Sequence, residues 1–325
     1  MSNWQEELAT GFQTAAELLR YLELPVALGS QDAEVIFKTK VPRAFVDRMQ
    51  KGCPSDPLLR QVLAIDAELY SSAAYRSDPL EESRFNPLPG LIHKYHSRVL
   101  LMLSGACAIN CRYCFRRHFP YQDNRPGKPG LAAIQDYIRA RPEIEEVILS
   151  GGDPLILNNH YFQQLLDSLQ PIPHVNTLRI HSRIPIVLPS RIEETWLKMM
   201  DHTPWHKVMV THCNHPQEID AAVQRGIAKL KDHGWVVLNQ AVLLKGVNDE
   251  LQVQVELAKT LFATGILPYY LHLLDPVAGA MHFDSIAPDI ISLYQQMQSR
   301  LPGYLLPRLV QELPGAHHKS LVQIS

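Results

Sequence analysis

Residues 99–117 read VLLMLSGACAINCRYCFRR, an apolar run followed closely by three cysteines within eight residues. The apolar run is short and bounded by a glycine, which is typical of a buried strand. Cys107, Cys111 and Cys114 follow in one loop, separated by three and two residues. The chain has five cysteines, and an odd cluster argues against a disulfide framework. The stretch therefore predicts a strand that leads into a loop of metal-binding thiolates.

Beyond residue 90 the chain alternates between short apolar runs and longer stretches with helical spacing. We expect strands at residues 99–103, 147–150, 177–180, 207–210, 236–244 and 270–274, and helices at 131–140, 161–169, 193–200, 218–233 and 251–263. Asn158 and Pro216 are suited to begin two of these helices. The alternation indicates βαβ units and a parallel sheet. Six units fit an α/β fold of the partial (β/α)6 barrel type, and a doubly wound open sheet fits the same pattern.

The first ninety residues have a different pattern. Apolar residues at helical spacing predict amphipathic helices within residues 12–22 and 58–69. Pro87, Pro89 and Gly90 then break the spacing. We expect a helical N-terminal region at residues 1–90, a partial barrel at 91–290 and a C-terminal segment at 291–325.

Composition narrows the class of protein. With 31 basic and 33 acidic residues the formal net charge is −2, which favours neither nucleic acid nor an anionic membrane as a partner. The first thirty residues lack the basic-then-apolar pattern of a signal peptide, and no apolar run has the roughly 18 residues needed to span a bilayer. We expect a soluble, cytoplasmic protein.

Polar residues gather where the predicted strands end. They include Cys107, Asp153, which follows the glycine pair Gly151-Gly152, and also His181, His212 and Asp275, while Gln240 lies within the fifth predicted strand. In parallel barrels the loops at the carboxyl ends of the strands build the active site. We therefore expect these side chains to meet in one place.

Three thiolates from one loop suit a [4Fe–4S] cluster in which one iron stays open. A zinc site completed by His118 and a chance grouping of structural cysteines are alternatives. The spacing, with Tyr113 before the third cysteine, resembles the signature of the radical S-adenosylmethionine (SAM) enzymes. That resemblance implies that SAM binds the open iron.

Further motifs resemble the lysine 2,3-aminomutase family, and the match extends from about residue 90 to the C-terminus. The matching segments are His93-Lys94-Tyr95, Arg98-Val99-Leu100, Cys114-Phe115-Arg116-Arg117, Ser150-Gly151-Gly152-Asp153, Arg179-Ile180-His181-Ser182-Arg183, Asn239-Gln240 and Pro314-Gly315-Ala316-His317-His318-Lys319. The chain looks most similar to the bacterial branch that makes (R)-β-lysine for elongation factor P. The resemblance implies an isomerase, with a lysyl ligase and elongation factor P as downstream partners.

The resemblance also assigns cofactor residues. It implies that pyridoxal phosphate (PLP) forms a Schiff base with Lys319 and that Lys94 and Arg98 hold its phosphate. Without the resemblance, a lysine six residues from a chain end would be read as a mobile, solvated group. SAM would be contacted by Gly151, Gly152, Asp153, His212 and Gln240.

Substrate choice rests on charge. The resemblance implies that Arg116 pairs with the α-carboxylate of the substrate, a contact suited to a planar guanidinium. Asp275 and Glu312 would hold the distal ammonium. Two carboxylates around one ligand favour a cation over glutamate, so the expected substrate is L-lysine.

The sequence departs from the family pattern at two places, and it leaves two alternatives to the expected function open. Ala316-His317-His318 replaces the usual glycine run before Lys319, and Glu312 stands where an aspartate is usual. Arginine or another amino acid could be the substrate of such an aminomutase. A non-catalytic iron–sulfur sensor is the alternative from another class.

Overall fold

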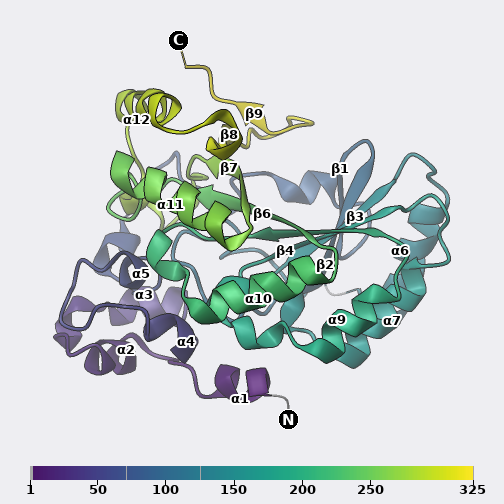
Figure 1. Cartoon of the computed structure of the whole chain (residues 1–325), viewed down its shortest axis with the longest axis horizontal. Coiled ribbons are helices and arrows are strands. Elements are labelled where there is room, and N and C mark those ends of the chain that lie inside the picture. Colours follow the sequence, from purple (N-terminus) through teal and green to yellow (C-terminus); the bar gives the residue numbers. More distant parts are fainter. Residues whose placement is uncertain (1–2, 71, 125, 325) are drawn as a thin grey trace.

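The computed structural model of the chain describes residues 3–70, 72–124 and 126–324. Within them nine strands form one sheet in chain order (Figure 1). The strands are β1 (Leu91–Tyr95), β2 (Arg98–Ser104), β3 (Glu146–Gly151), β4 (Thr177–Ser182), β5 (His206–Thr211), β6 (Val236–Val242), β7 (Leu267–His272), β8 (Arg308–Gln311) and β9 (Ser320–Leu321). Neighbours from β2 to β8 are parallel, whereas β1 and β9 are antiparallel edges. This arrangement confirms the predicted partial barrel and extends it by one parallel strand, β8.

Longer helices alternate with the parallel strands, as expected. They are α6 (Gly127–Arg139), α7 (Asn159–Leu169), α9 (Glu194–Asp201), α10 (Ala221–Asp232), α11 (Leu251–Thr264) and α12 (Ala287–Arg300). Asn158 caps α7, because its side chain accepts a hydrogen bond from the Tyr161 amide at 2.8 Å. Pro216 instead begins a short 3-10 turn, and Asp220 caps α10. The helix α12 was not predicted.

Buried aromatic residues hold the outer helices against the sheet. Trp196 of α9 stacks on Trp235 with ring centroids 5.4 Å apart and meets Phe162 of α7 at 5.9 Å. Trp196 and Phe162 are fully buried, and Trp235 is nearly so. Burying each ring contributes roughly 1.5–3 kcal/mol or more. This layer leaves the other face of the sheet free to line a cavity.

The N-terminal region consists of short helices, drawn in purple to blue in Figure 1. They are α1 (Asn3–Ala9), α2 (Ala15–Tyr21), α3 (Gln31–Ile36), α4 (Arg43–Val46), α5 (Pro57–Arg60) and the 3-10 turns η1 (Val26–Leu28), η2 (Asp66–Leu69) and η3 (Glu82–Phe85). The prediction of one helix within residues 58–69 was wrong. Ile65 is extended, with φ −133° and ψ 156°, and separates α5 from η2.

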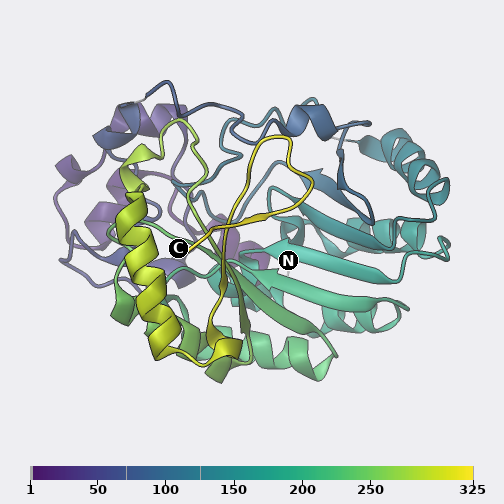
Figure 2. The same ribbon diagram turned by 90° about the horizontal axis from the view of Figure 1, so that it is seen from above.

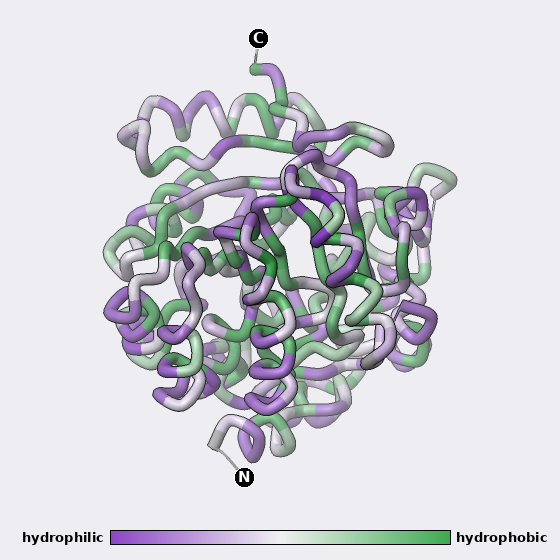
Figure 3. Tube along the Cα trace, turned by 90° about the vertical axis from the view of Figure 1, so that its right-hand side faces the viewer, coloured by the Kyte–Doolittle hydropathy of each residue, from purple (hydrophilic) through white to green (hydrophobic). Residues whose placement is uncertain are grey.

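Short turns complete the catalogue of elements. They are α8 (Ile184–Val187), η4 (Pro154–Ile156), η5 (Pro189–Arg191), η6 (Pro216–Glu218), η7 (Met281–Phe283) and η8 (Gly303–Leu305). Among the described residues no helix is both long and apolar enough to cross a membrane. Figure 3 accordingly shows hydrophilic positions interspersed with hydrophobic ones along the chain.

The C-terminal segment folds back on the sheet through β9. Strand β9 pairs with β8 through Val310 and Leu321 and through Gln311 and Ser320. The loop between these strands, residues 312–319, arches over the sheet (Figure 2). The predicted C-terminal segment thus contributes two strands to the sheet, while the domain boundaries themselves stay a prediction.

Candidate active site

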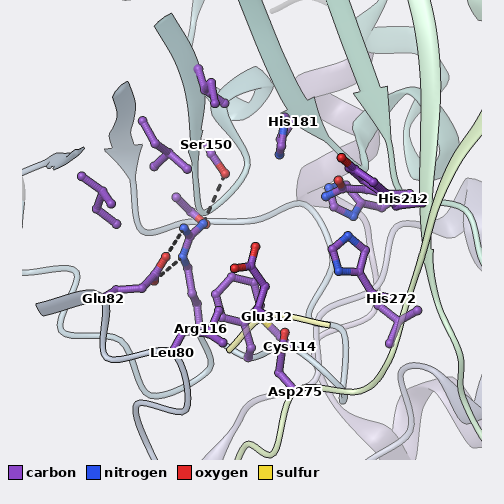
Figure 4. A pocket seen from close by; sticks show the side chains of 18 of the residues that line it. Leu80, Glu82, Cys114, Arg116, Ser150, His181, His212, His272, Asp275 and Glu312 are labelled. Atoms are coloured by element: carbon purple, nitrogen blue, oxygen red, sulfur yellow. Dashed lines mark hydrogen bonds and ion pairs between the residues drawn. The ribbon is translucent and has the colours of Figure 1, made fainter. Parts of the chain in front are cut away.

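The predicted site residues line one cavity of about 380 Å³. They are Lys94, Arg98, Cys107, Cys111, Cys114, Arg116, Gly151, Gly152, Asp153, His212, Gln240, Asp275, Glu312 and Lys319. Most follow or end a parallel strand, so the sheet brings together residues that are more than two hundred positions apart in the chain. Figure 4 shows several of these side chains turned toward a common space.

The cysteine loop is held from outside by the N-terminal region. Arg112 has no exposed surface, and its guanidinium donates to both carboxylate oxygens of Glu68 at 2.6 and 2.8 Å. Arg117 donates to the same carboxylate at 2.8 Å. One buried carboxylate therefore anchors the two arginines on either side of Cys114. Glu68 was not predicted, because nothing in the sequence links it to a loop some forty residues away.

The three thiols lie in different electrostatic surroundings. Burial raises the pKa of Cys114 to about 11 and raises that of Cys107 as well. Arg183 donates to the Cys111 sulfur at 2.7 Å. Three thiolates on one cavity wall repel one another, so they need a positively charged metal group to be ionised together.

The arrangement bears on which metal group fits. Among the described residues, no three His, Cys, Asp or Glu side chains are placed to hold a single metal ion. The His118 ring nitrogen Nε2 instead lies 3.1 Å from the carbonyl oxygen of Ala278. The geometry gives no support to zinc bound by the cysteines and His118. In a cluster each cysteine binds a different iron, so the ligands need not converge on one point.

Gly151 and Gly152 form a tight turn against the start of the cysteine loop. Gly151 has φ of 109°, which favours glycine. A Cβ on Gly152 would lie 2.4 Å from the carbonyl oxygen of Ala106. The Gly152 amide donates to the Ser104 carbonyl at 2.7 Å. The glycines therefore allow close backbone packing that positions the loop.

The Asp153 carboxylate is already used within the protein. It accepts hydrogen bonds from the Ser182 hydroxyl at 2.7 Å and from the Arg183 amide at 2.8 Å. The amides of Leu155 and Ile184 complete the set. Asp153 therefore joins the turn after β3 to the end of β4 and also lines the cavity, and its contact with SAM stays a prediction.

The loop between β8 and β9 brings Lys319 into the cavity. Its Nζ lies 2.5 Å from one oxygen of Glu312, and the Nζ of Lys94 lies 3.1 Å from the other. Burial alone would raise the pKa of Glu312, but Lys319 and Lys94 outweigh burial and lower it to about 2. Glu312, which we expected beside the distal ammonium of the substrate, thus pairs with the two lysines predicted to bind the cofactor.

Asp275 is a carboxyl group that faces the cavity without a partner. Its side chain makes no hydrogen bond or ion pair within the described residues. Burial raises its pKa to about 7 against the opposing effect of Lys319, and the nearby carboxylates Glu312 and Glu82 act in the same direction as burial. An ammonium group placed beside Asp275 would favour the ionised form, so this position suits a cationic ligand.

Arg116 is paired with a carboxylate that we did not predict. Its Nε and Nη2 donate to the two oxygens of Glu82 at 2.8 and 2.6 Å (Figure 4). Its Nη1 donates to the Ser150 hydroxyl at 3.2 Å. Both side chains are largely buried, and although burial alone would lower the pKa of Arg116, Glu82 keeps it above its usual value. Glu82 comes from η3 in the N-terminal region.

Basic residues gather around Tyr95 in the wall of the cavity. The Arg98 guanidinium stacks over the Tyr95 ring at 4.3 Å and takes part in no ion pair among the described residues. Arg179 also lines the cavity and pairs with Glu146 at 2.9 Å. Together with Lys94, these groups form a cationic end that suits a phosphate.

Three neutral histidines complete the wall. Burial lowers the pKa of His212 to about 3 and the pKa values of His181 and His272 well below the usual value. Within the described residues, Nε2 of His181 and of His272 have no hydrogen-bond partner. Buried polar atoms without partners favour a bound ligand that supplies them.

Comparisons with known proteins agree with this site. A family model described as "4Fe-4S single cluster domain" matches residues 96–176. The L-lysine 2,3-aminomutase of Haemophilus influenzae is 45% identical over 98% of this chain and 95% of its own length. That of Escherichia coli is 43% identical over 98% and 94%. That of Clostridium subterminale is 34% identical over 99% of this chain and 78% of its own length.

A radical SAM methyltransferase from Sphaerobacter thermophilus aligns with a TM-score of 0.44 at 18% identity, over 68% of each chain. The match to a single-cluster domain over residues 96–176 places the cysteine loop in the class of [4Fe–4S] cluster domains. From its full-length relatives, the chain belongs to the lysine 2,3-aminomutase family.

Proposed function

We propose that this chain is an L-lysine 2,3-aminomutase, an isomerase that moves the amino group of L-lysine from C2 to C3. It would use a [4Fe–4S] cluster, SAM and PLP. The observation that carries the proposal is one cavity, which is lined by the three cysteine thiols, by Lys319, by the cationic end and by the carboxyl groups of Asp275 and Glu312. Each of these features matches a requirement of that reaction.

Cofactor positions follow from the chemistry of the lining. We assign Cys107, Cys111 and Cys114 to the cluster, and Gly151, Gly152, His212 and Gln240 to the neighbouring SAM site. Asp153 supports that site through the backbone that it holds. When bound, the cluster and SAM supply a hydrogen-abstracting radical, and PLP supplies a conjugated system through which an amino group can migrate.

Lys319 is the residue that we assign to PLP. A primary amine is required for covalent attachment of a carbonyl cofactor. Lys319 lies on a loop anchored at both ends by paired strands, which gives it a defined position. Lys94 and Arg98 lie at the cationic end, where they would hold a phosphate.

The remaining residues would place the substrate. Arg116 would bind the α-carboxylate, and Asp275 would accept the distal ammonium. Glu312 would join Asp275 once Lys94 engages a phosphate, because one of its two lysine partners is then withdrawn.

We further propose that the product is (R)-β-lysine, that a lysyl ligase attaches it to elongation factor P, and that this takes place in the cytoplasm. The resemblance of the sequence to that bacterial branch supports these points. The proposal does not involve nucleic acid or a membrane.

The test is a product assay on the full chain, reconstituted without oxygen with iron, sulfide and PLP. SAM and a strong reductant are added with L-lysine, L-arginine or L-glutamate, and the products are analysed by mass spectrometry after chromatographic separation. We expect β-lysine from lysine, with much less turnover of the other two amino acids. Turnover of arginine or glutamate in place of lysine would reject the substrate, and no turnover by a fully loaded sample would favour a sensor.

A further inference from the structure

A short segment of the N-terminal region crosses the cavity and inserts a carboxylate into it. We call residues 72–86 the strap. Its inner side chains Leu80, Glu82 and Phe85 line the cavity. The side chain of Glu82 is only 13% exposed, although its neighbour Arg84 is 68% exposed. The strap therefore has a cavity face and a solvent face.

Glu82 occupies the donors on Arg116 that a substrate carboxylate needs. It accepts from Nε and Nη2 at 2.8 and 2.6 Å, which is the two-pronged geometry of a bound carboxylate. The remaining nitrogen, Nη1, faces Ser150 and the Gly151 carbonyl. A second carboxylate cannot pair with the same edge of the guanidinium while Glu82 stays there.

Charge leads to the same conclusion. The pair of Arg116 and Glu82 is neutral, so an entering carboxylate would find no net attraction there. Removing Glu82 alone would leave a buried guanidinium without a partner, which is costly. Exchange of one carboxylate for another keeps Arg116 paired at the start and at the end.

The strap is also joined to the loop that carries Asp275. The Arg76 amide donates to the Pro276 carbonyl at 2.9 Å, and the Ala278 amide donates to the Arg76 carbonyl at the same distance. Tyr75 donates to Asp284 at 2.5 Å. The strap thus links both positions that we assign to the two ends of the substrate.

We propose that Glu82 is a specificity-determining residue that holds the place of the substrate carboxylate on Arg116. The strap opens when a ligand brings its own carboxylate to Arg116, and Glu82 then moves into solvent. Amines that lack a carboxylate leave the strap closed. This inference rests on the proposed function, because it takes Arg116 as the carboxylate site.

The first test measures hydrogen exchange of strap amides by mass spectrometry in the full chain loaded with cluster and PLP. L-Lysine is compared with cadaverine, which has the same two-amine length without the carboxylate. We expect lysine, but not cadaverine, to speed exchange in the strap. Equal responses to the two ligands, or no response to lysine, would overturn the proposal.

Variants give the second test. Glu82→Gln weakens the pair with Arg116 and should open the strap without a ligand, and Glu82→Asp should have a smaller effect. Glu81→Gln is the matched control, since Glu81 pairs with exposed Arg84. Slow exchange in β2–β4 verifies that each variant is folded. Strap exchange in Glu82→Gln equal to that of Glu81→Gln would overturn the proposal.

The KM for lysine shows whether Glu82 competes with the substrate carboxylate or only orients Arg116. If Glu82 competes with the substrate, Glu82→Gln lowers KM for lysine by about tenfold, the effect of one charge-assisted contact. If Glu82 instead only orients Arg116, KM rises, and the proposal is rejected. If the strap opens for lysine but the enzyme makes no β-lysine, the proposed reaction is rejected, and the proposed role of Glu82 in the strap is retained. If the enzyme makes β-lysine but the strap does not respond to lysine, the role of Glu82 is rejected, and the proposed reaction is retained.

Discussion

Replacement of Glu312 by glutamine should destabilise the cofactor-free chain by an amount that depends on pH. Glu312 pairs with Lys319 at 2.5 Å and with Lys94 at 3.1 Å, and its side chain is 10% exposed. These lysines lower its pKa from 4.5 to about 2. The difference in pKa corresponds to about 3 kcal/mol in the free energy of unfolding.

The sign follows from proton binding. The pKa of Glu312 is lower in the folded chain, so the unfolded chain binds the proton more tightly. The stabilisation is therefore fully present above about pH 4.5 and is lost as the pH falls toward 2. The glutamine variant cannot titrate, so its deficit relative to wild type should shrink over that range.

The assay is urea unfolding of wild type and Glu312→Gln at pH 7 and pH 3, without PLP or SAM. Glu194→Gln is the control, because the Glu194 side chain is 58% exposed and its pairs are 4.0 Å long. We expect a deficit of about 3 kcal/mol at pH 7 and a smaller one at pH 3 for Glu312→Gln, with almost none for the control. A deficit that is absent, or that is the same at both pH values, would refute the assignment of Glu312 as the partner of the two lysines.

Three other predictions concern the same cavity. In Gly152→Ala the added methyl group would clash with the Ala106 carbonyl and displace the start of the cysteine loop. We expect less iron and sulfide bound per chain after reconstitution. Gly303→Ala is the control, because Gly303 has open space around it, and this variant should bind as much iron and sulfide as wild type. Glu68→Ala should lower the free energy of unfolding by about 3–5 kcal/mol, because Arg112 and Arg117 lose a buried partner. Denaturant unfolding measures this loss. A loss below about 1 kcal/mol would contradict the role of Glu68 as the residue that holds the two arginines. Because the pKa of Asp275 is about 7, the carboxyl group ionises as the pH rises through 7, and KM for lysine should fall over that range. Asp275→Asn should abolish this pH dependence of KM. An unchanged pH profile in the variant would show that Asp275 does not bind the ammonium group.

Sequence patterns were sufficient for the parts of the fold that repeat. Each predicted strand overlaps one of β2 to β7, because each of these strands contains a short stretch rich in apolar residues. Strand β8 was missed because it has four residues and follows directly after Pro307. Strand β9 has two residues and exists only through its pairing with β8.

For the candidate site, too, one part could be predicted from the sequence and another part could not. Its cavity residues follow from motifs at strand ends, which topology brings together. Their actual partners do not follow, since Glu82 and Glu68 are ordinary acids on short turns in the sequence. What makes them important is contact with Arg116 and with Arg112, and such long-range pairing leaves no local pattern.

The central claim is that the loop between β8 and β9 carries Lys319 into the cavity of the cysteine loop as the PLP-binding residue. The most direct measurement is borohydride reduction of the PLP-loaded full chain, followed by peptide mapping. We predict that the phosphopyridoxyl group is found on Lys319. A label on Lys94, or on any other lysine in its place, would contradict the account.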